Sequence, residues 1–285
     1  MTSDNGGQDS RRRWGSAQAI LAWLGWLAGV FLVLILVSKL LAPQVERLFL
    51  GPPTPTAIIT PTPSPPKAAI VDQTGYSFPS PEFITKAREY LEGSGYVVDV
   101  YPPEEVAINF FQTLPDHGYR LILFQTHSTS EVVTESEGGF DASNAPPGPF
   151  LFTTELYEKQ RYIRLQMEDQ VRASKLFYED SPLLFAIGPK FVRLSMSGLF
   201  PNTVIIIGGC QSLAVPDLAR AFLDRNASVV IGWDGMVDLS HNNKAVLHLL
   251  HALTVEGLSP QRAVEQTTAE IGPDPTYGSV LLHLP

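Results

Sequence analysis

Short, continuously apolar segments alternate with segments of helical periodicity over most of the chain from residue 68 onward. Each apolar segment suits a strand that is buried on both faces of a sheet. The pairs Ser80–Pro81 and Ser259–Pro260 suit the N-cap and first position of a helix. The sequence predicts strands over residues 68–72, 96–101, 120–126, 204–209 and 228–233, and helices over residues 81–92, 103–114, 216–225, 240–257 and 259–272.

Apolar strands that alternate with helices form βαβ units, and the strands of such units are parallel. We therefore expect an α/β fold over residues 68–285, doubly wound, with a mostly parallel sheet and helices on both faces. In such sheets the functional crevice lies beyond the carboxyl ends of the strands. The residues that directly follow a strand are the first candidates for a functional site.

A separate apolar segment lies near the N-terminus. The 25 residues from Trp14 to Ser38 carry no charge, and about 20 apolar residues suffice to span a bilayer. We interpret residues 14–41 as an uncleaved signal anchor, a single transmembrane helix, because a signal peptide has a shorter apolar region with a cleavage site behind it. The basic cluster at residues 11–13 favours a cytoplasmic tail at residues 1–13 and an extracytoplasmic C-terminal domain.

The anchor and the α/β segment are joined by residues 51–67, which are rich in proline, threonine and serine. This composition stays extended and cannot form a packed core. We interpret it as a stalk that holds the following domain away from the lipid bilayer, which is the expected partner of the N-terminal helix.

Charge and cysteine content exclude some classes of function. The formal net charge of the chain is −9, and the acidic excess lies in residues 67–285. A nucleic-acid binder needs a basic face, so we expect no nucleic-acid partner. Cys210 is the only cysteine, which leaves no intramolecular disulfide and no cysteine-based metal site. It is either a small buried core residue or a nucleophile.

A histidine and this cysteine follow two of the predicted strands. His127 comes directly after the strand at 120–126, and Cys210 directly after the strand at 204–209. Two such strands that are neighbours in a parallel sheet would bring an imidazole and a thiol to one edge. The thiolate is a nucleophile, and a nearby imidazole can lower the pKa of the thiol or take its proton.

The two segments "YRLILFQTHS" and "NTVIIIGGCQS" resemble the strand–histidine and strand–cysteine blocks of the caspase-like cysteine peptidases. The downstream segments, residues 217–233 and 251–266, are most similar to CHAT domains within that family. The resemblance covers about half of residues 68–285. It implies a caspase-like fold and an endopeptidase that acts on a peptide or protein substrate, and we expect no cofactor.

The resemblance also implies a role for each matching residue. His127 would act as general base or imidazolium partner, and Cys210 would attack the scissile carbonyl to form an acyl-enzyme. The oxyanion hole would consist of the backbone N–H of Cys210 and one from Ser128 or Thr129. Water would then attack the acyl-enzyme and release the product.

Three features depart from the family pattern. Ser128 stands where the family usually has glycine, and a serine would be strained there if the position needed a positive φ. His127 and Cys210 lie 83 residues apart, compared with roughly 50 in caspases. We interpret the extra residues, about 131–200, as an inserted hairpin or helical subdomain. No internal cleavage signature indicates activation by processing.

Charged residues beyond the strand at 228–233 could set specificity. Asp234 and Asp238 are candidates for a substrate pocket that takes a basic side chain, although loop carboxylates are usually only solvated. His248 and His251 could share a face of one helix, with His241 before them. No third ligand lies within reach of the two, so we expect no metal site.

Three functional hypotheses follow from these residues. The leading one is a membrane-anchored extracytoplasmic cysteine endopeptidase with a His127–Cys210 dyad. The alternative is a catalytically degenerate caspase-like or CHAT module that serves as a binding or signalling domain. The third is another hydrolase with Ser212 as nucleophile, which the lack of a Gly-x-Ser-x-Gly motif around that residue disfavours.

Overall fold

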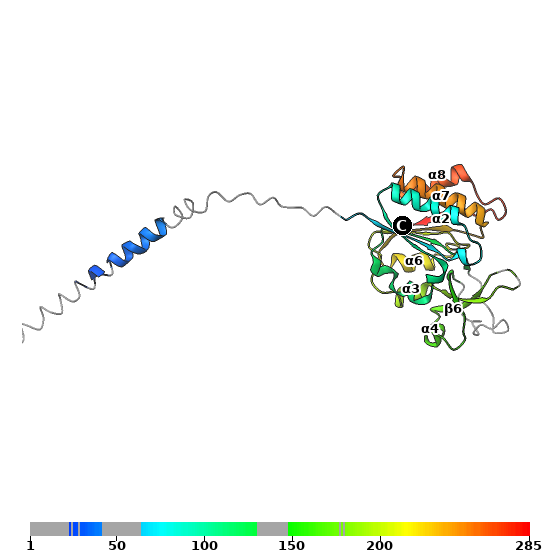
Figure 1. Ribbon diagram of the computed structural model, residues 1–285, viewed down its shortest axis with the longest axis horizontal. Helices are drawn as coiled ribbons and strands as arrows, with labels where there is room; N and C mark the ends of the chain where they lie inside the picture. The colour runs from blue at the N-terminus through cyan, green and yellow to red at the C-terminus, as the bar shows by residue number, and fades with distance from the viewer. Residues whose placement is uncertain are drawn as a thin grey trace, which may run out of the picture. The chain divides into compact units, whose positions relative to one another are not determined.

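The computed structural model describes residues 23, 25–27, 29–41, 64–129, 148–176, 178 and 180–285 (Figure 1). The chain divides into two compact units, Met1–Pro63 and Ser64–Pro285.

In the first unit the described residues 23, 25–27 and 29–41 are helical. Among the residues that the structure describes, no helix combines the length and the apolar character that crossing a bilayer requires. The other residues of the expected signal anchor, and the stalk up to residue 63, lie outside the described residues. The anchor therefore stays a prediction.

The second unit is built on a six-stranded sheet with the order β10-β9-β8-β3-β1-β2. Five strands run parallel, and β10 pairs antiparallel with β9 at one edge. The strands are β1 (Lys67–Asp72), β2 (Val97–Tyr101), β3 (Leu121–Gln125), β8 (Thr203–Ile207), β9 (Ala227–Trp233) and β10 (Leu281–Leu284). The expected α/β fold with a mostly parallel sheet is confirmed. The antiparallel strand β10 was not predicted.

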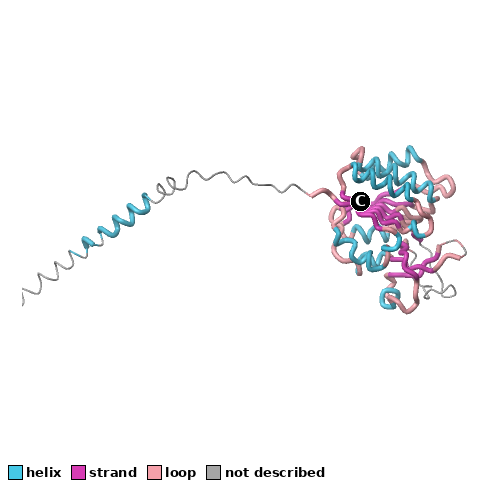
Figure 2. Tube along the Cα trace, in the orientation of Figure 1, coloured by secondary structure: helices cyan, strands magenta, loops and turns pink. Residues whose placement is uncertain are grey.

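Helices cover both faces of this sheet (Figures 1 and 2). One layer contains α2 (Pro81–Gly93), α7 (Leu239–Thr254) and α8 (Pro260–Ile271); the other contains α3 (Ile108–Thr113), α5 (Pro189–Leu194) and α6 (Asp217–Leu223). Successive residues of β1 enter opposite cores, since Ala68 and Ile70 pack in the first layer and Ala69 and Val71 in the second. Burial on both faces explains why these strands are apolar throughout.

The helix predicted over residues 103–114 is wrong in its extent. The segment divides into the 3-10 helix η2 (Pro103–Glu105), α3, and the 3-10 helix η3 (Leu114–His117). Pro115 lies at the start of η3, and because proline has no N–H to donate to the preceding turn, α3 ends at Thr113. A third 3-10 helix, η1 (Thr74–Tyr76), follows β1.

The segment between β3 and β8 forms a second sheet with the order β4-β5-β7-β6, all antiparallel. Its strands are β4 (Ser128–Thr129), β5 (Phe150–Leu156), β6 (Val171–Lys175) and β7 (Leu183–Ile187), and the short helix α4 (Ile163–Met167) precedes β6. In the described residues of the insertion expected at about 131–200, three antiparallel strands, β5, β6 and β7, form most of this sheet, where the sequence predicts a hairpin or a helical subdomain. Its residues 130–147 lie outside the described part of the chain.

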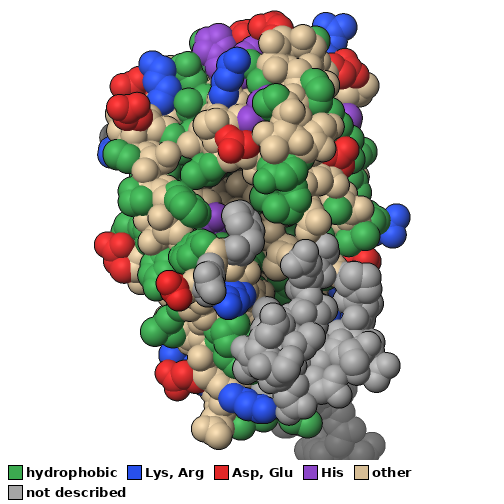
Figure 3. Space-filling model, turned by 90° about the vertical axis from the view of Figure 1, so that its right-hand side faces the viewer, with side chains coloured by type: hydrophobic (Ala, Val, Ile, Leu, Met, Phe, Trp, Pro, Cys, Tyr) green, Lys and Arg blue, Asp and Glu red, His purple; other side chains and the backbone are tan. Residues whose placement is uncertain are grey.

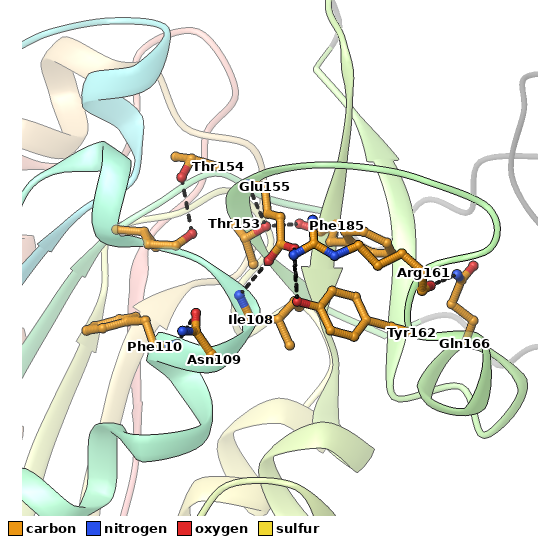
Figure 4. Close-up of polar contacts among 11 residues, drawn as sticks. Ile108, Asn109, Phe110, Thr153, Thr154, Glu155, Arg161, Tyr162, Gln166 and Phe185 are labelled. Atoms are coloured by element: carbon orange, nitrogen blue, oxygen red, sulfur yellow. Dashed lines mark hydrogen bonds and ion pairs between the residues drawn. The ribbon is translucent and has the colours of Figure 1, made fainter.

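One carboxylate ties the second sheet to the main domain (Figure 4). The Glu155 side chain at the end of β5 is 9% exposed and forms an ion pair with Arg161 at 2.7 Å. Its carboxylate also accepts hydrogen bonds from the backbone N–H of Ile108 at 3.0 Å and from the Tyr162 hydroxyl at 2.9 Å. Glu155 thus satisfies the first N–H of α3 and orients the turn before α4.

We expect Glu155→Ala to lower the free energy of unfolding in urea by about 2–3 kcal/mol, because it leaves the Ile108 N–H and the Arg161 charge without their carboxylate. The control is Glu92→Ala, which removes an ion pair with Arg88 on the exposed surface of α2, and which we expect to leave the unfolding midpoint close to wild type. Equal effects of the two variants would contradict an anchoring role for Glu155.

Candidate functional site

His127 and Cys210 follow two strands that are neighbours in the sheet. Strands β3 and β8 pair in parallel, with Phe124 opposite Ile207. His127 lies three residues after Phe124, and Cys210 three residues after Ile207. Because parallel strands end at the same edge, the equal offset brings the imidazole and the thiol to the same place.

Both residues line one cavity of about 240 Å³ at this edge. The other lining residues come from η1 and the segment after it, from the ends of β3 and β8, from α7 and the loop before it, and from the loop before β10: Thr74, Phe78, Thr126, Gly208, Gly209, Val237, Asp238, Leu239, Asn242 and Tyr277. Figure 3 shows a hollow in the molecular surface with hydrophobic side chains gathered around it. The cavity offers a recess, open to the surface, next to the only thiol of the chain.

The backbone of His127 is held by the buried side chain of Gln73, the residue that follows β1. Gln73 is fully buried, and its Oε1 accepts a hydrogen bond from the His127 backbone N–H at 2.8 Å. The amide of Gln73 donates in turn to the carbonyl of Thr153 in β5 at 3.2 Å. The His127 ring packs edge-on against Phe78 and Phe152, with centroids 5.8 and 6.1 Å away.

The imidazole of His127 is held in its neutral form. Its Nε2 is buried and has no hydrogen-bond partner among the described residues. Burial lowers the pKa of His127 to about 4, because a charged imidazolium loses its hydration there. At neutral pH the ring is therefore uncharged and has a nitrogen that can accept a proton.

The thiol of Cys210 is held in its neutral form as well. Burial raises the pKa of Cys210, although the backbone N–H groups of Val237 and of Cys210 itself favour the thiolate. The sulfur lies 3.5 Å from both the nitrogen and the carbonyl oxygen of Val237. Between His127 and Cys210, both within the described residues, no hydrogen bond is formed. The resting pair is thus a neutral imidazole and a neutral thiol.

Glycine before the cysteine allows the ends of β3 and β8 to touch. A Cβ on Gly209 would lie 2.4 Å from the carbonyl oxygen of Thr126 and 2.5 Å from Oγ of Ser128. No side chain fits in this space. After the cysteine, Gln211 has a φ of 56°, a left-handed conformation that residues other than glycine seldom adopt. The chain therefore turns sharply at Cys210.

Ser128 is accommodated without the strain considered from the sequence. It belongs to the extended strand β4, which pairs with β5. Its hydroxyl donates to the carbonyl oxygen of Cys210 at 2.5 Å. This hydrogen bond links the loop that carries His127 directly to the loop that carries Cys210. Thr129, the other residue considered for the oxyanion hole, is the second residue of β4.

The two carboxylates predicted for a substrate pocket lie in different places. Asp238 lines the cavity and is the N-cap of α7, where Oδ1 accepts the backbone N–H of Ser240 at 2.8 Å and that of His241 at 3.3 Å. A hydrogen bond from the Ser240 hydroxyl and those two N–H groups lower the pKa of Asp238. Asp234 does not line the cavity, and it accepts the backbone N–H of Val280 at 2.8 Å.

Two other groups considered from the sequence have structural partners. Ser212 is fully buried, and its Oγ donates to the carbonyl of Ile207 and accepts the N–H of Trp233. It therefore does not reach the cavity as a nucleophile. His248 and His251 bind different partners: the first contacts Thr267 and Glu270, and the second contacts Glu256.

Neither a scan against protein-family models nor a search of curated proteins finds a match for this chain. The interpretation of the site therefore depends on its own geometry.

Sequence reasoning missed several residues of the site, including Gln73, Phe78, Asn242 and Tyr277. Gln73 directly follows β1, so the rule that singled out His127 and Cys210 could also have found it. Phe78 and Tyr277 lie in segments outside helices and strands, and nothing in their sequence context places them at the carboxyl edge.

We expect the rate of Cys210 alkylation by iodoacetamide to rise with pH through an inflection above the ordinary thiol value of about 8.5, because burial disfavours the thiolate. Cys210 is the only cysteine, so the label reports on it alone. The urea-unfolded chain provides the control and should titrate near the ordinary value. An inflection well below it, lost in His127→Ala, would contradict a neutral resting pair.

Proposed function

We propose that this chain is a membrane-anchored, extracytoplasmic cysteine endopeptidase of the caspase-like type, with Cys210 as nucleophile and His127 as general base. The observation that carries the proposal is the position of both side chains at the ends of the paired strands β3 and β8, on one cavity. An imidazole that is neutral at pH 7 and a thiol beside it are the two groups that acyl transfer through a thioester requires.

In the proposed reaction the His127 imidazole accepts the thiol proton while Sγ of Cys210 attacks the scissile carbonyl carbon. The resulting oxyanion is held by the backbone N–H of Cys210 and that of Ser128. The imidazolium then gives its proton to the leaving amine nitrogen as the carbon–nitrogen bond breaks. Water attacks the thioester and gives a proton to His127, which returns it to the sulfur as the carbon–sulfur bond breaks.

The proposed location is supported by the N-terminal sequence alone. The uncharged segment from Trp14 to Ser38 follows the basic cluster at residues 11–13, and a proline-rich segment separates it from the α/β unit. This order suits a single-pass anchor with its short tail in the cytoplasm. A tethered catalytic domain would then act on peptides or proteins near the outer membrane surface.

The first test is hydrolysis of fluorescein-labelled casein by the full-length chain in detergent micelles. We expect Cys210→Ala to lower the rate by about 10³-fold or more, and His127→Ala by about 10²-fold or more, because each removes one partner of the acyl transfer. His251→Ala is the matched control, since this ring lies on the surface of α7 beside Glu256, and it should keep the wild-type rate. Full activity in Cys210→Ala would end the proposal.

The pH profile provides a second test. The imidazole must be neutral to accept the thiol proton, so kcat/KM should fall as pH decreases through the pKa of His127 in the free enzyme. Because burial lowers that pKa to about 4, we expect the acid limb well below the ordinary histidine value of about 6.5. An acid limb at 6.5 would show that a hydrated or differently placed base limits the rate.

A second candidate function is a degenerate module that binds partners. It is favoured by the raised pKa of the Cys210 thiol and by the lack of a hydrogen bond between that thiol and His127. The two functions differ in the reactivity of Cys210 toward a peptidyl acyloxymethyl ketone relative to iodoacetamide. An endopeptidase should react faster with the peptidyl reagent, whereas a binding module should show no such preference.

A further inference from the structure

The walls of the cavity beside Cys210 are mainly apolar. Phe78, Val237, Leu239 and Tyr277 line it. The two aromatic side chains remain 41% and 54% exposed, although removing large apolar surfaces from water is favourable. A molecule that enters the cavity would cover these rings and gain that free energy.

The segments that carry the rings are held in position. Asp274 is 1% exposed, and its carboxylate accepts the backbone N–H groups of Asp238 and Tyr277, both at 2.8 Å. This carboxylate therefore joins the loop before α7 to the loop before β10. The Phe78 ring packs edge-on against His127 and against Tyr178, with centroids 5.8 and 6.3 Å away. A pocket whose walls are fixed in advance loses less entropy when it binds.

Among the residues that the structure describes, Asp238 is the carboxylate that lines the cavity, and the fold already uses it. Oδ1 of Asp238 accepts the backbone N–H groups of Ser240 and His241 and also the Ser240 hydroxyl, at 2.6 Å. These bonds cap α7 and compete with any charged group of a ligand. Asp234, the other acidic candidate, lies away from the cavity. The arrangement therefore favours an apolar occupant over a basic one.

We propose that this cavity binds an apolar side chain of leucine or phenylalanine size on the acyl side of the scissile bond, and that Phe78 and Tyr277 determine this specificity. The inference rests on the proposed function and adds a substrate class to it. The side chain of the residue whose carbonyl is attacked begins two bonds from the reacting carbon. A cavity lined by Cys210 is therefore within its reach.

The test uses the full-length chain in detergent micelles and a panel of acetyl-Ala-Ala-X aminomethylcoumarin amides, with X as Leu, Phe, Ala, Arg or Asp. The coumarin leaving group has no amino-acid side chain, so the panel reports only on the acyl side. We expect kcat/KM for Leu and Phe to exceed that for Ala, Arg and Asp by about 10-fold or more, the discrimination that an apolar pocket provides.

Variants of the walls connect this preference to the cavity. Phe78→Ala and Tyr277→Ala should each lower the ratio of kcat/KM for the Leu and Phe substrates to kcat/KM for the Ala substrate by about 10-fold. Tyr76→Ala is the matched control, because this ring is 44% exposed and lies two residues from Phe78 but does not line the cavity. It should leave the whole panel unchanged.

The outcomes separate this inference from the proposed function. Turnover that depends on Cys210 but prefers Arg, and loses that preference in Asp238→Asn, overturns the apolar pocket alone. A flat panel, or a Leu preference that survives both wall variants, also overturns it alone. Failure of every amide to show turnover that depends on Cys210 overturns the pocket together with the endopeptidase.

Discussion

The close approach of two strand ends is the constraint on which the rest of the site depends. No side chain fits at Gly209, between the Thr126 carbonyl and the Ser128 hydroxyl. The hydroxyl then binds the Cys210 carbonyl, so the two loops that carry the imidazole and the thiol cannot separate independently. Any larger residue at Gly209 would push β3 and β8 apart where they end. The part of the cavity wall that Gly209 forms would then be lost.

A layer of side-chain amides that pair with one another lies at this edge. Asn242 of α7 accepts the indole N–H of Trp233 at 2.8 Å and donates to Gln125 at 3.2 Å. Gln125 donates in turn to Asn243 at 2.7 Å. Buried polar groups are costly unless they are paired, and here the pairs join β9, α7 and β3 beneath the cavity. The sheet and the helix are thereby held in register around the site.

The main sheet could be predicted because each of its inner strands faces two apolar cores, which leaves continuous apolar runs in the sequence. The second sheet was not predicted, since β4, β5 and β6 carry charged or polar residues. Its strand β7 is a continuous apolar run (LLFAI), which the strand rule could have found. Arg172 in β6 is 8% exposed; it pairs with Asp169 at 2.6 Å and lies over the Phe150 ring at 4.2 Å. Those partners make its burial possible, but both come from contacts that no periodicity in the sequence reveals. The sequence indicated His127 and Cys210 because each directly follows an apolar strand. It did not indicate Phe78 and Tyr277, because they reach the cavity from segments outside helices and strands.

The burial of His127 and Cys210 also sets how the thiol can react. Burial lowers the pKa of His127 and raises that of Cys210, so both shifts disfavour a standing ion pair. Proton transfer must then accompany attack on a carbonyl that is already in place. The Phe78 ring contacts the His127 imidazole and also forms a wall of the cavity. A substrate side chain that packs on Phe78 would therefore restrict the position of the imidazole as well. Binding and activation would therefore be coupled through one aromatic contact, and a free thiol of this kind would react slowly with molecules that do not fill the cavity.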